Sequence, residues 1–554
     1  MISSQWLRQA RRVGLIACLV AALGFVAGCG GGDNGGSSGG GEAKLLKIGT
    51  ANEVDSLNPL VGVSILATEF SHQMYPFLTQ YDQNANLGGA YAKSWKFSNG
   101  FKTLTFQLTP GGKWSDGKPL TAKDAAFTLQ TIVKYAKGPT AYAYGAVPTL
   151  KGATAPDDNT LVIQYTAPSP QAPSQLSFIP ILPEHVWSQY ATGDGKGLQT
   201  FQNKAPVVSG GPFTLQAYAP KQFAKFVRND DFYGSKPHVQ QIGYTIFSSP
   251  DALVKAIQSG EIDAAEQASP SSLSALRQAG LNIQDPVSFS ELWLMINDSS
   301  GKTPPLHPEL HNAKVRKAFD MAIDRDRVVK TAYFGQGEPG SSLIPPSAGK
   351  YHLDQPVTTF DIDGANALLD EAGYKRGADG TRVADGHPMS YKLVEFKLSG
   401  GAEDPAAQII KSDFAKLGVK VDIQVLDVAA AIGALMDKDY STFDLSVVTF
   451  VGSYDPANVL NSLRCASLTS FNPNGHCDKK YDDLFLKLGQ LPEGQARVDV
   501  AHQLQQMMAD DGSLLTLAYS KDIYAYRDGW TGFEPSPSGW FFGTGTATSV
   551  GKAS

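Results

Sequence analysis

The chain has 554 residues, of which 42% are hydrophobic, and a formal net charge of −6 at pH 7. This length is enough for two or three compact lobes, and charges of both signs are mixed along it, which argues against nucleic acid as a partner. Beyond Val26 no stretch approaches 18 consecutive apolar residues, so the sequence predicts no membrane-spanning helix after the N-terminal segment.

The first 28 residues are typical of an export signal. Three arginines within the first twelve residues precede an apolar stretch from 13 to 27, which is shorter than the roughly 20 residues needed to span a bilayer. Residues 26–29 read VAGC, the pattern at which bacterial lipoprotein precursors are cleaved and lipidated. We therefore expect a lipid on Cys29; a lone buried cysteine is the alternative.

The segment 29–42 is predicted to be a tether that follows the lipidated cysteine. Residues 30–41 include eight glycines and two serines, a composition that cannot bury apolar surface and behaves as a flexible coil. A lipid followed by a tether predicts a protein that is anchored to a membrane and faces the periplasm or the cell exterior.

Strand and helix patterns alternate along the rest of the chain. Apolar or alternating stretches predict strands at 44–50, 103–108, 160–165, 419–425 and 443–451. Apolar residues at helical spacing predict helices after Thr121 and at 252–257, 313–325, 363–373 and 407–417. Thr121 can cap its helix, because its hydroxyl accepts a free N–H of the first turn, and Asp124 lies in that turn.

The most specific motif is the string WSDGKPLTAKD at residues 114–124. It resembles the signature of the family 5 extracellular solute-binding proteins, the peptide, nickel and oligosaccharide receptors of ABC importers. Further stretches resemble motifs of the family in the same order: 52–59, 209–213, 228–233, 259–263, 313–325 and 363–373. The resemblance extends from about residue 45 to the last forty residues.

The resemblance implies an α/β fold: the two-lobed periplasmic-binding-protein fold of type II, cluster C, with an extra subdomain and a two-strand hinge. On this chain the first lobe would comprise 43–80, 206–296 and 519–554, the extra subdomain 81–205, and the second lobe 297–518. The two crossings between the lobes would be the strands 292–296 and 515–518.

The function implied is that of a substrate-binding lipoprotein of an ABC importer, a monomer that delivers a peptide or peptide-like solute to a permease and its ATPase subunits. Oligosaccharide or another non-peptide solute is the second expectation, and nickel or its chelate the third. A ligand-sensing lipoprotein without a transport role is an alternative. H-E-x-x-H is missing from the sequence, and G-x-S-x-G is missing outside the glycine- and serine-rich tether, so neither an enzyme nor a cofactor is expected.

The resemblance also implies where the ligand binds. In peptide-binding relatives, an aspartate just before a pair formed by an acidic residue and a proline holds the α-ammonium of the ligand. On this chain, counting back from Pro456 places the position of that aspartate at Gly452 or, with a slip of one residue, at Ser453. Neither side chain is charged, which puts ordinary free-amino peptides in doubt because a buried ammonium needs a counter-ion. Asp455 is the nearest acidic substitute. The segments expected to line the cleft are Val61, Gly62 and Val63, and Phe450, Val451, Gly452, Ser453, Tyr454 and Asp455.

Two further polar residues are expected at the other end of the ligand. Alignment of the helix at 407–417 with dipeptide-binding relatives brings Lys397 near the position that holds the carboxylate of the ligand, and Glu395 lies on the same stretch. An ordinary surface lysine is the alternative interpretation of Lys397.

The remaining cysteines, Cys465 and Cys477, stand twelve residues apart in a polar loop. A disulfide between them would stabilise the loop by up to ~3 kcal/mol, and metal binding by the pair is the alternative. The pair also matches the dipeptide-binding branch of the family in place and spacing. His307 and His311 flank Glu309, which could suggest a metal site; Pro308 interrupts a regular helix there, and a solvated loop is the preferred interpretation.

Overall fold

The computed structural model forms one compact unit over residues 39–554. The described residues are 41–298, 307–396, 401–435, 437, 440–468, 472, 474–536, 539–541, 543 and 545–553. The predicted signal at 1–28 and the predicted lipidation site at Cys29 lie outside this range. None of the described helices is both long and apolar enough to cross a membrane.

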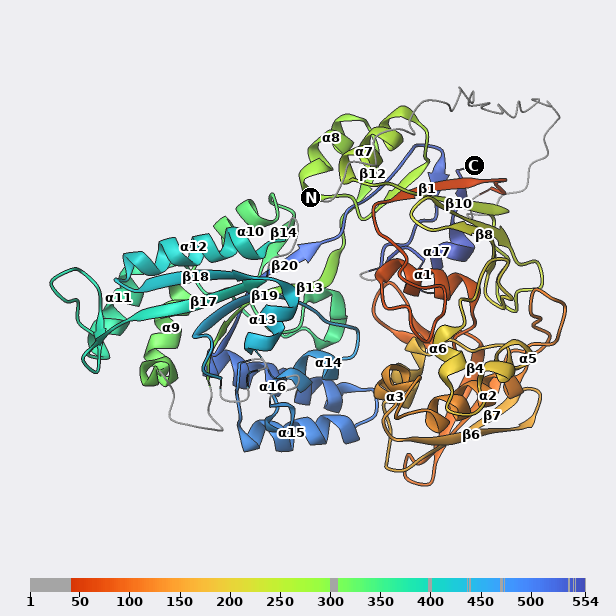
Figure 1. Cartoon of the computed structure of the whole chain (residues 1–554), viewed down its shortest axis with the longest axis horizontal. Helices are drawn as coiled ribbons and strands as arrows, with labels where there is room; N and C mark the ends of the chain where they lie inside the picture. Colours follow the sequence, from red (N-terminus) through yellow and green to blue (C-terminus); the bar gives the residue numbers. More distant parts are fainter. Residues whose placement is uncertain are drawn as a thin grey trace, which may run out of the picture. The chain divides into compact units, whose positions relative to one another are not determined.

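The first of three large sheets has seven strands drawn from three separate parts of the chain (Figure 1). In spatial order they are β12 (Asn282–Gln284), β21 (Tyr524–Tyr526), β11 (Ala264–Glu266), β1 (Leu46–Thr50), β10 (Gln241–Ile246), β9 (Phe223–Arg228) and β8 (Phe213–Ala219). The central strand β1 is parallel to both of its neighbours, and its residues Leu46 and Ile48 are fully buried. The helices of this part are α1 (Ile65–Met74), α7 (Pro250–Ser259), α8 (Leu273–Gln278) and α17 (Gly545–Ser549). The predicted helix at 252–257 is α7, and it ends at Gly260, whose φ of 81° favours glycine.

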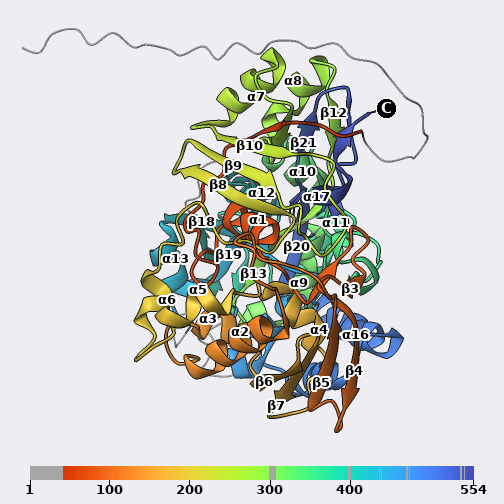
Figure 2. The same cartoon turned by 90° about the vertical axis from the view of Figure 1, so that its right-hand side faces the viewer.

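A four-stranded antiparallel sheet forms a separate layer between residues 92 and 165 (Figure 2). Its strands are β4 (Ala92–Ser98), β5 (Thr103–Leu108), β7 (Thr160–Tyr165) and β6 (Leu150–Asp157), and the helix α2 (Ala122–Lys134) packs on it. The expected cap of α2 is present, because Thr121 accepts a hydrogen bond from the first turn and Asp124 accepts one from the N–H of Thr121 at 3.0 Å. Shorter elements flank this sheet: β2 (Thr79–Tyr81), β3 (Leu87–Gly89), α3 (Ala141–Ala146), α4 (Ala172–Gln175), α5 (Glu184–Trp187) and α6 (Lys196–Thr200).

The third sheet has six strands and lies between two layers of helices. Its order is β14 (Gly337–Pro339), β20 (Leu514–Lys521), β13 (Val287–Ile296), β19 (Leu445–Val451), β17 (Ser390–Phe396) and β18 (Lys420–Leu426). Alternate residues of β13 point to opposite faces: Leu292 and Leu294 join one apolar cluster, and Trp293 and Met295 join another. The first cluster includes residues of α9 (Ala313–Met321), α10 (Arg325–Ala332), α11 (Ile362–Glu371) and α12 (Glu403–Lys416). The second includes residues of α13 (Val428–Leu435), α14 (Ala457–Leu460), α15 (Lys479–Gln490) and α16 (Gln495–Asp511).

The strands expected at the lobe crossings, 292–296 and 515–518, lie in β13 and β20. All of β13 and β20 belong to the six-stranded sheet, where β13 pairs with β19 from Ser290 to Ile296 and with β20 on its other side. The chain therefore crosses between the two larger sheets at 285–286 and at 522–523, the short connections to β12 and β21. β13 is buried on both faces and lies in the interior of this sheet.

The helix predicted at 313–325 is interrupted. The helix α9 ends at Met321, and Asp324 then caps α10 by accepting a hydrogen bond from the N–H of Arg327 at 2.9 Å. An aspartate can accept this bond at a helix start and thereby competes with continued helix.

Two buried carboxyl groups in the first lobe predict a pH-dependent stability. Glu69 on α1 and Glu266 at the end of β11 are buried neighbours, and Glu69 accepts the N–H of Phe541 at 2.8 Å. Burial, together with the neighbouring carboxyl for Glu266, raises the pKa of both groups, so at least one proton is retained in the folded state. The stability they contribute is fully present below about pH 4.5, the ordinary pKa of glutamate, and is lost as the pH rises through the raised values.

The Glu266→Gln variant should therefore show a weaker fall in unfolding free energy between pH 5 and pH 9 than the wild type, as measured by urea denaturation. Glutamine keeps a neutral hydrogen-bonding group at this position and cannot ionise. Equal pH dependence in the two proteins would show that the pair is not protonated.

Candidate ligand-binding cleft

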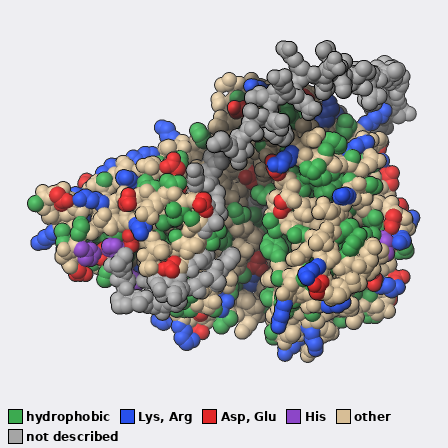
Figure 3. Space-filling view, viewed as in Figure 1, with side chains coloured by type: hydrophobic (Ala, Val, Ile, Leu, Met, Phe, Trp, Pro, Cys, Tyr) green, Lys and Arg blue, Asp and Glu red, His purple; other side chains and the backbone are tan. Residues whose placement is uncertain are grey.

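A cavity of about 580 Å³ lies where the chain crosses between the two larger sheets. One wall comes from residues between 52 and 77 and from 267–270, and the opposite wall from 288–290 and 451–454. The lining also includes 520–523, which contain the second crossing, and Figure 3 shows the hollow that separates the two sides. Most of the lining is apolar or uncharged, as is usual for sites that bind small organic ligands.

A second cavity of about 930 Å³ continues from the first. It lies between the residues around α3 and α4 on one side and those of α14 to α16 on the other. Both cavities are lined by Tyr142, Phe178, Gly452 and Ser453, so they form one extended cleft. This cleft has room for a ligand longer than a single amino acid.

The segment 61–63 borders the cleft, but its amide groups are already engaged. Gly62 and Val63 line the first cavity, whereas the side chain of Val61 is exposed and does not line it. The N–H groups of Val61 and Gly62 both donate to the carbonyl of Asn58, at 3.0 and 2.8 Å, and that of Val63 donates to Asp55 at 2.9 Å. A ligand would therefore meet the carbonyl oxygens of this segment and not its N–H groups.

Most of the second predicted segment also borders the cleft. Val451, Gly452, Ser453 and Tyr454 line the first cavity, and Tyr454 stacks on Tyr81 with ring centroids 4.3 Å apart. Phe450 does not line either cavity and stacks on Trp293 instead, with centroids 4.5 Å apart. Phe450 thus supports the cleft strand from behind.

The structure gives a physical reason why position 452 carries no aspartate. A Cβ on Gly452 would lie 3.1 Å from a methyl group of Val459 and 3.5 Å from Oε1 of Glu291. Glu291 is fully buried and accepts a hydrogen bond from Nε1 of Trp293 at 3.1 Å, and burial raises its pKa well above the usual range. An aspartate at 452 would place a second carboxyl group beside this one.

Asp455 is already paired inside the protein. Its Oδ1 accepts the guanidinium of Arg497 at 2.5 Å and the N–H of Ala457 at 2.9 Å, and the Arg497 side chain is fully buried. Asp455 lines the second cavity, but its charge is compensated there. This geometry gives Asp455 a structural role and makes it a poor substitute for the missing aspartate.

Of the two residues predicted for the other end of the ligand, only Glu395 is among the described residues. Glu395 lies near the end of β17, buried, and is not among the described residues that line either cavity. Burial and the nearby Asp404 and Glu403 raise the pKa of Glu395 to about 7. Lys397 lies outside the described residues.

One cleft residue, Asp522, was missed by the sequence reasoning. It lies in the second crossing, where its N–H donates to the carbonyl of Pro286 in the first crossing at 3.0 Å. Among the described residues that line the first cavity it is the only acidic one, and burial raises its pKa to about 7. Of the basic residues there, Lys521 pairs with Glu338 at 2.9 Å, and burial lowers the pKa of His72 to about 3. The available clue in the sequence was an acidic residue just after the predicted return strand.

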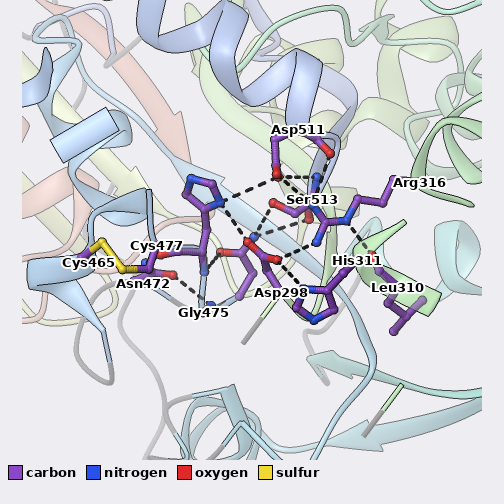
Figure 4. A network of polar contacts seen from close by, with 12 residues as sticks. Asp298, Leu310, His311, Arg316, Cys465, Asn472, Gly475, Cys477, Asp511 and Ser513 are labelled. Atoms are coloured by element: carbon purple, nitrogen blue, oxygen red, sulfur yellow. Dashed lines mark hydrogen bonds and ion pairs between the residues drawn. A yellow bond between two sulfur atoms is a disulfide. The ribbon is translucent and has the colours of Figure 1, made fainter. Parts of the chain in front are cut away.

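A disulfide joins Cys465 to Cys477, and the loop that it closes is held by a buried ion-pair network (Figure 4). Nδ1 of His476 lies 2.9 Å from Asp298, and the guanidinium of Arg316 contacts Asp298 at 2.6 Å and Asp511 at 2.8 Å. His476, Asp298 and Asp511 are close enough to hold a metal ion, but Arg316 already supplies the positive charge. The network therefore ties the loop to α9 and α16.

Two lobes with a cleft at the crossings between them are the architecture that the sequence resemblance predicts. Residues 86–468 match the family described as bacterial extracellular solute-binding proteins, family 5 Middle, and the chain belongs to this family. It is thus a solute-binding protein and not an enzyme.

Individual relatives agree with this assignment. The chain is 26% identical over 469 residues to the dipeptide-binding protein of Escherichia coli K12, covering 81% of this chain and 84% of the relative. Its fold is similar to that of the substrate-binding protein CtaP from Listeria monocytogenes, with a TM-score of 0.78 at 20% identity, over 93% of this chain and 100% of the other. It is also similar to the oligopeptide-binding protein AppA from Bacillus subtilis, solved with a nonapeptide: the TM-score is 0.71 at 21% identity, over 93% and 100% of the two chains.

Proposed function

We propose that this chain is the substrate-binding lipoprotein of an ABC importer and captures a peptide or peptide-like solute between its two lobes. The observation that carries the proposal is the extended cleft at the two crossings, with Asp522 as the one acidic residue among the described residues that line its first cavity. The peptide class is supported by the relatives, one described as dipeptide-binding and another solved with a nonapeptide.

Asp522 is proposed to hold the α-ammonium of the ligand in place of the aspartate that position 452 lacks. A carboxyl group with a raised pKa ionises readily when an ammonium approaches it, because the new positive charge favours the charged form. The remaining contacts are assigned to Gly62, Val63, Gly452 and Ser453, which border the same cavity. Tyr454 would provide an aromatic wall.

The lobes are proposed to move about the crossings at 285–286 and 522–523. In this division the first lobe comprises 43–80, 206–284 and 524–554, the extra subdomain 81–205, and the second lobe 287–521. Ligand contacts made only in the closed arrangement would favour closure, and the closed form would be the one that a permease recognises. Asp522 lies in a crossing, so a ligand bound to it would bias this equilibrium directly.

The N-terminus is proposed to carry a lipid on Cys29 and a tether to about residue 42. The tether would keep a monomeric body close to the permease and its ATPase subunits, at the membrane surface that faces the periplasm or the cell exterior.

Uptake by living cells tests the transport role. A strain without this protein should take up labelled peptides more slowly than the wild type. Cells that carry the Cys29→Ser variant should release the protein from the membrane fraction and show similarly reduced uptake. Unchanged uptake, with an altered transcriptional response to the peptides, would instead support a ligand-sensing lipoprotein.

A further inference from the structure

A cluster of two histidines and a glutamate lies in the second lobe, away from the cleft. His307 and Glu309 belong to a short turn of 3-10 helix at Pro308–His311 and the residue before it, and His387 lies in the hairpin of β15 (Val383–Ala384) and β16 (His387–Pro388). One nitrogen or oxygen from each of the three side chains lies within 4.8 Å of the others. None of the three lines either cavity of the cleft.

The spacing of these atoms fits a tetrahedral metal ion. Nδ1 of His307 lies 3.2 Å from Oε1 of Glu309, and Nε2 of His387 lies 3.8 Å from Oε2 of Glu309. With zinc–ligand bonds of about 2.0–2.1 Å, neighbouring ligand atoms of a tetrahedral site lie about 3.4 Å apart. The ligand atoms of the three groups lie within 4.8 Å of one another, so the two imidazole rings would have to move closer to the carboxylate to reach that separation.

The glutamate has an oxygen that the protein leaves without a partner. The Glu309 side chain is fully buried, and among the described residues no group hydrogen-bonds to its Oε2, because the 3.8 Å to His387 is too long. A buried carboxylate oxygen without a partner is costly, and a cation between it and the two imidazoles would satisfy it.

The surrounding residues orient the three groups in the way that metal sites require. Tyr391 donates its hydroxyl to Oε1 of Glu309 at 2.9 Å, which leaves Oε2 to face His387. Nε2 of His307 lies 3.6 Å from Asp444, which is itself held by the N–H of Lys392 at 2.8 Å. A carboxylate behind one imidazole nitrogen directs the other nitrogen to the metal.

The simpler interpretation is an ion pair between a protonated His307 and its two acidic neighbours. That arrangement accounts for Oε1 of Glu309 and for Asp444 but leaves Oε2 without a partner. In the network of Figure 4, by contrast, the Arg316 guanidinium already neutralises the comparable group of Asp298, His476 and Asp511. No arginine or lysine plays this part among the described residues that pair with Glu309.

We propose that His307 Nδ1, Glu309 Oε2 and His387 Nε2 bind one divalent ion of the zinc type, with water in the fourth position. The site is independent of solute capture and fastens the hairpin 383–388 to the turn at 308–311. His387 is 37% exposed, which gives the ion a path from solvent.

Zinc titration of the tag-free full-length protein, after treatment with a chelator, tests this site. The wild type should bind one equivalent of Zn²⁺ and melt at a higher temperature with the ion than without it. The His387→Ala variant should lose both effects, and Asp444→Asn should bind zinc about 10–100-fold more weakly. His502→Ala, which removes a histidine outside the cluster, is the matched control and should behave as the wild type.

A wild type that binds no stoichiometric zinc, or a His387→Ala variant that binds it as tightly as the wild type, would overturn the proposal. Circular dichroism at the same temperatures shows whether each variant is folded, and His387→Gln replaces any alanine variant that is not. Peptide binding at the cleft, measured in parallel, should not change with zinc, so the outcome is separate from that of the proposed transport function.

Discussion

The Asp522→Asn variant is expected to bind peptides with a free α-amino group ~30-fold more weakly than the wild type at pH 8. A hydrogen bond to a charged group contributes about 2 kcal/mol, and asparagine keeps the size of the side chain but removes its charge. Isothermal titration calorimetry would measure the loss. Peptides acetylated at the N-terminus carry no ammonium, so they should bind the wild type and the variant alike.

The pH dependence of peptide binding tests the role of Asp522 independently of the loss of affinity in the variant. Burial raises the pKa of Asp522 to about 7 in the free protein, so the carboxyl group is increasingly protonated below that pH. The affinity of the wild type for free-amino peptides should therefore fall as the pH drops from 8 to 5, and that of Asp522→Asn should fall less. The matched control is Asp528→Asn, an exposed aspartate in the same part of the chain that contacts Asn282. If both aspartate variants bound like the wild type, Asp522 would not be the counter-ion.

The Arg497→Met variant is expected to lose about 3–5 kcal/mol of unfolding free energy. Arg497 is fully buried on α16, where it contacts Asp455 at 2.5 Å, the hydroxyl of Tyr351 at 3.1 Å and the carbonyl of Leu488 at 2.9 Å. Methionine fills part of the space but leaves Asp455 as an uncompensated charge at the start of α14. Urea denaturation, followed by circular dichroism, would measure the loss.

The double variant Arg497→Met/Asp455→Asn provides the control for this effect. It removes the orphaned charge and should recover part of the lost stability, because the penalty of the single variant comes largely from leaving one partner buried alone. If the unfolding free energy of Arg497→Met lay within 1 kcal/mol of that of the wild type, the ion pair of Arg497 with Asp455 would not contribute the stability proposed here.

Local sequence patterns predicted much of the fold. The motif at 114–124 becomes a turn and a capped helix, with Trp114 fully buried beneath it. Gly260 ends α7 as expected, and the strand predicted at 443–451 is β19, at 445–451. These features depend on residues close together in the chain, where capping and periodicity act.

The features that depend on distant residues were harder to predict. The central position of β13 depends on its pairing with β19 and β20, and its paired residues Ile296 and Leu445 are 149 positions apart (445 − 296) in the sequence. The pairing of Asp455 with Arg497 across 42 residues gives no local signal. In the same way His387 approaches Glu309 only after the second lobe has folded, so the short stretch 307–311 alone suggested a solvated loop.

The most direct test of the central claim is to identify what the cleft holds. The chain from residue 42 would be expressed without Cys29, purified under native conditions and denatured, and the released small molecules analysed by mass spectrometry. We expect short peptides with free α-amino groups, fewer of them from Asp522→Asn. A sugar, a blocked peptide or a metal chelate in their place would contradict the peptide assignment and show that the uncharged Gly452 and Ser453 mark another class of solute.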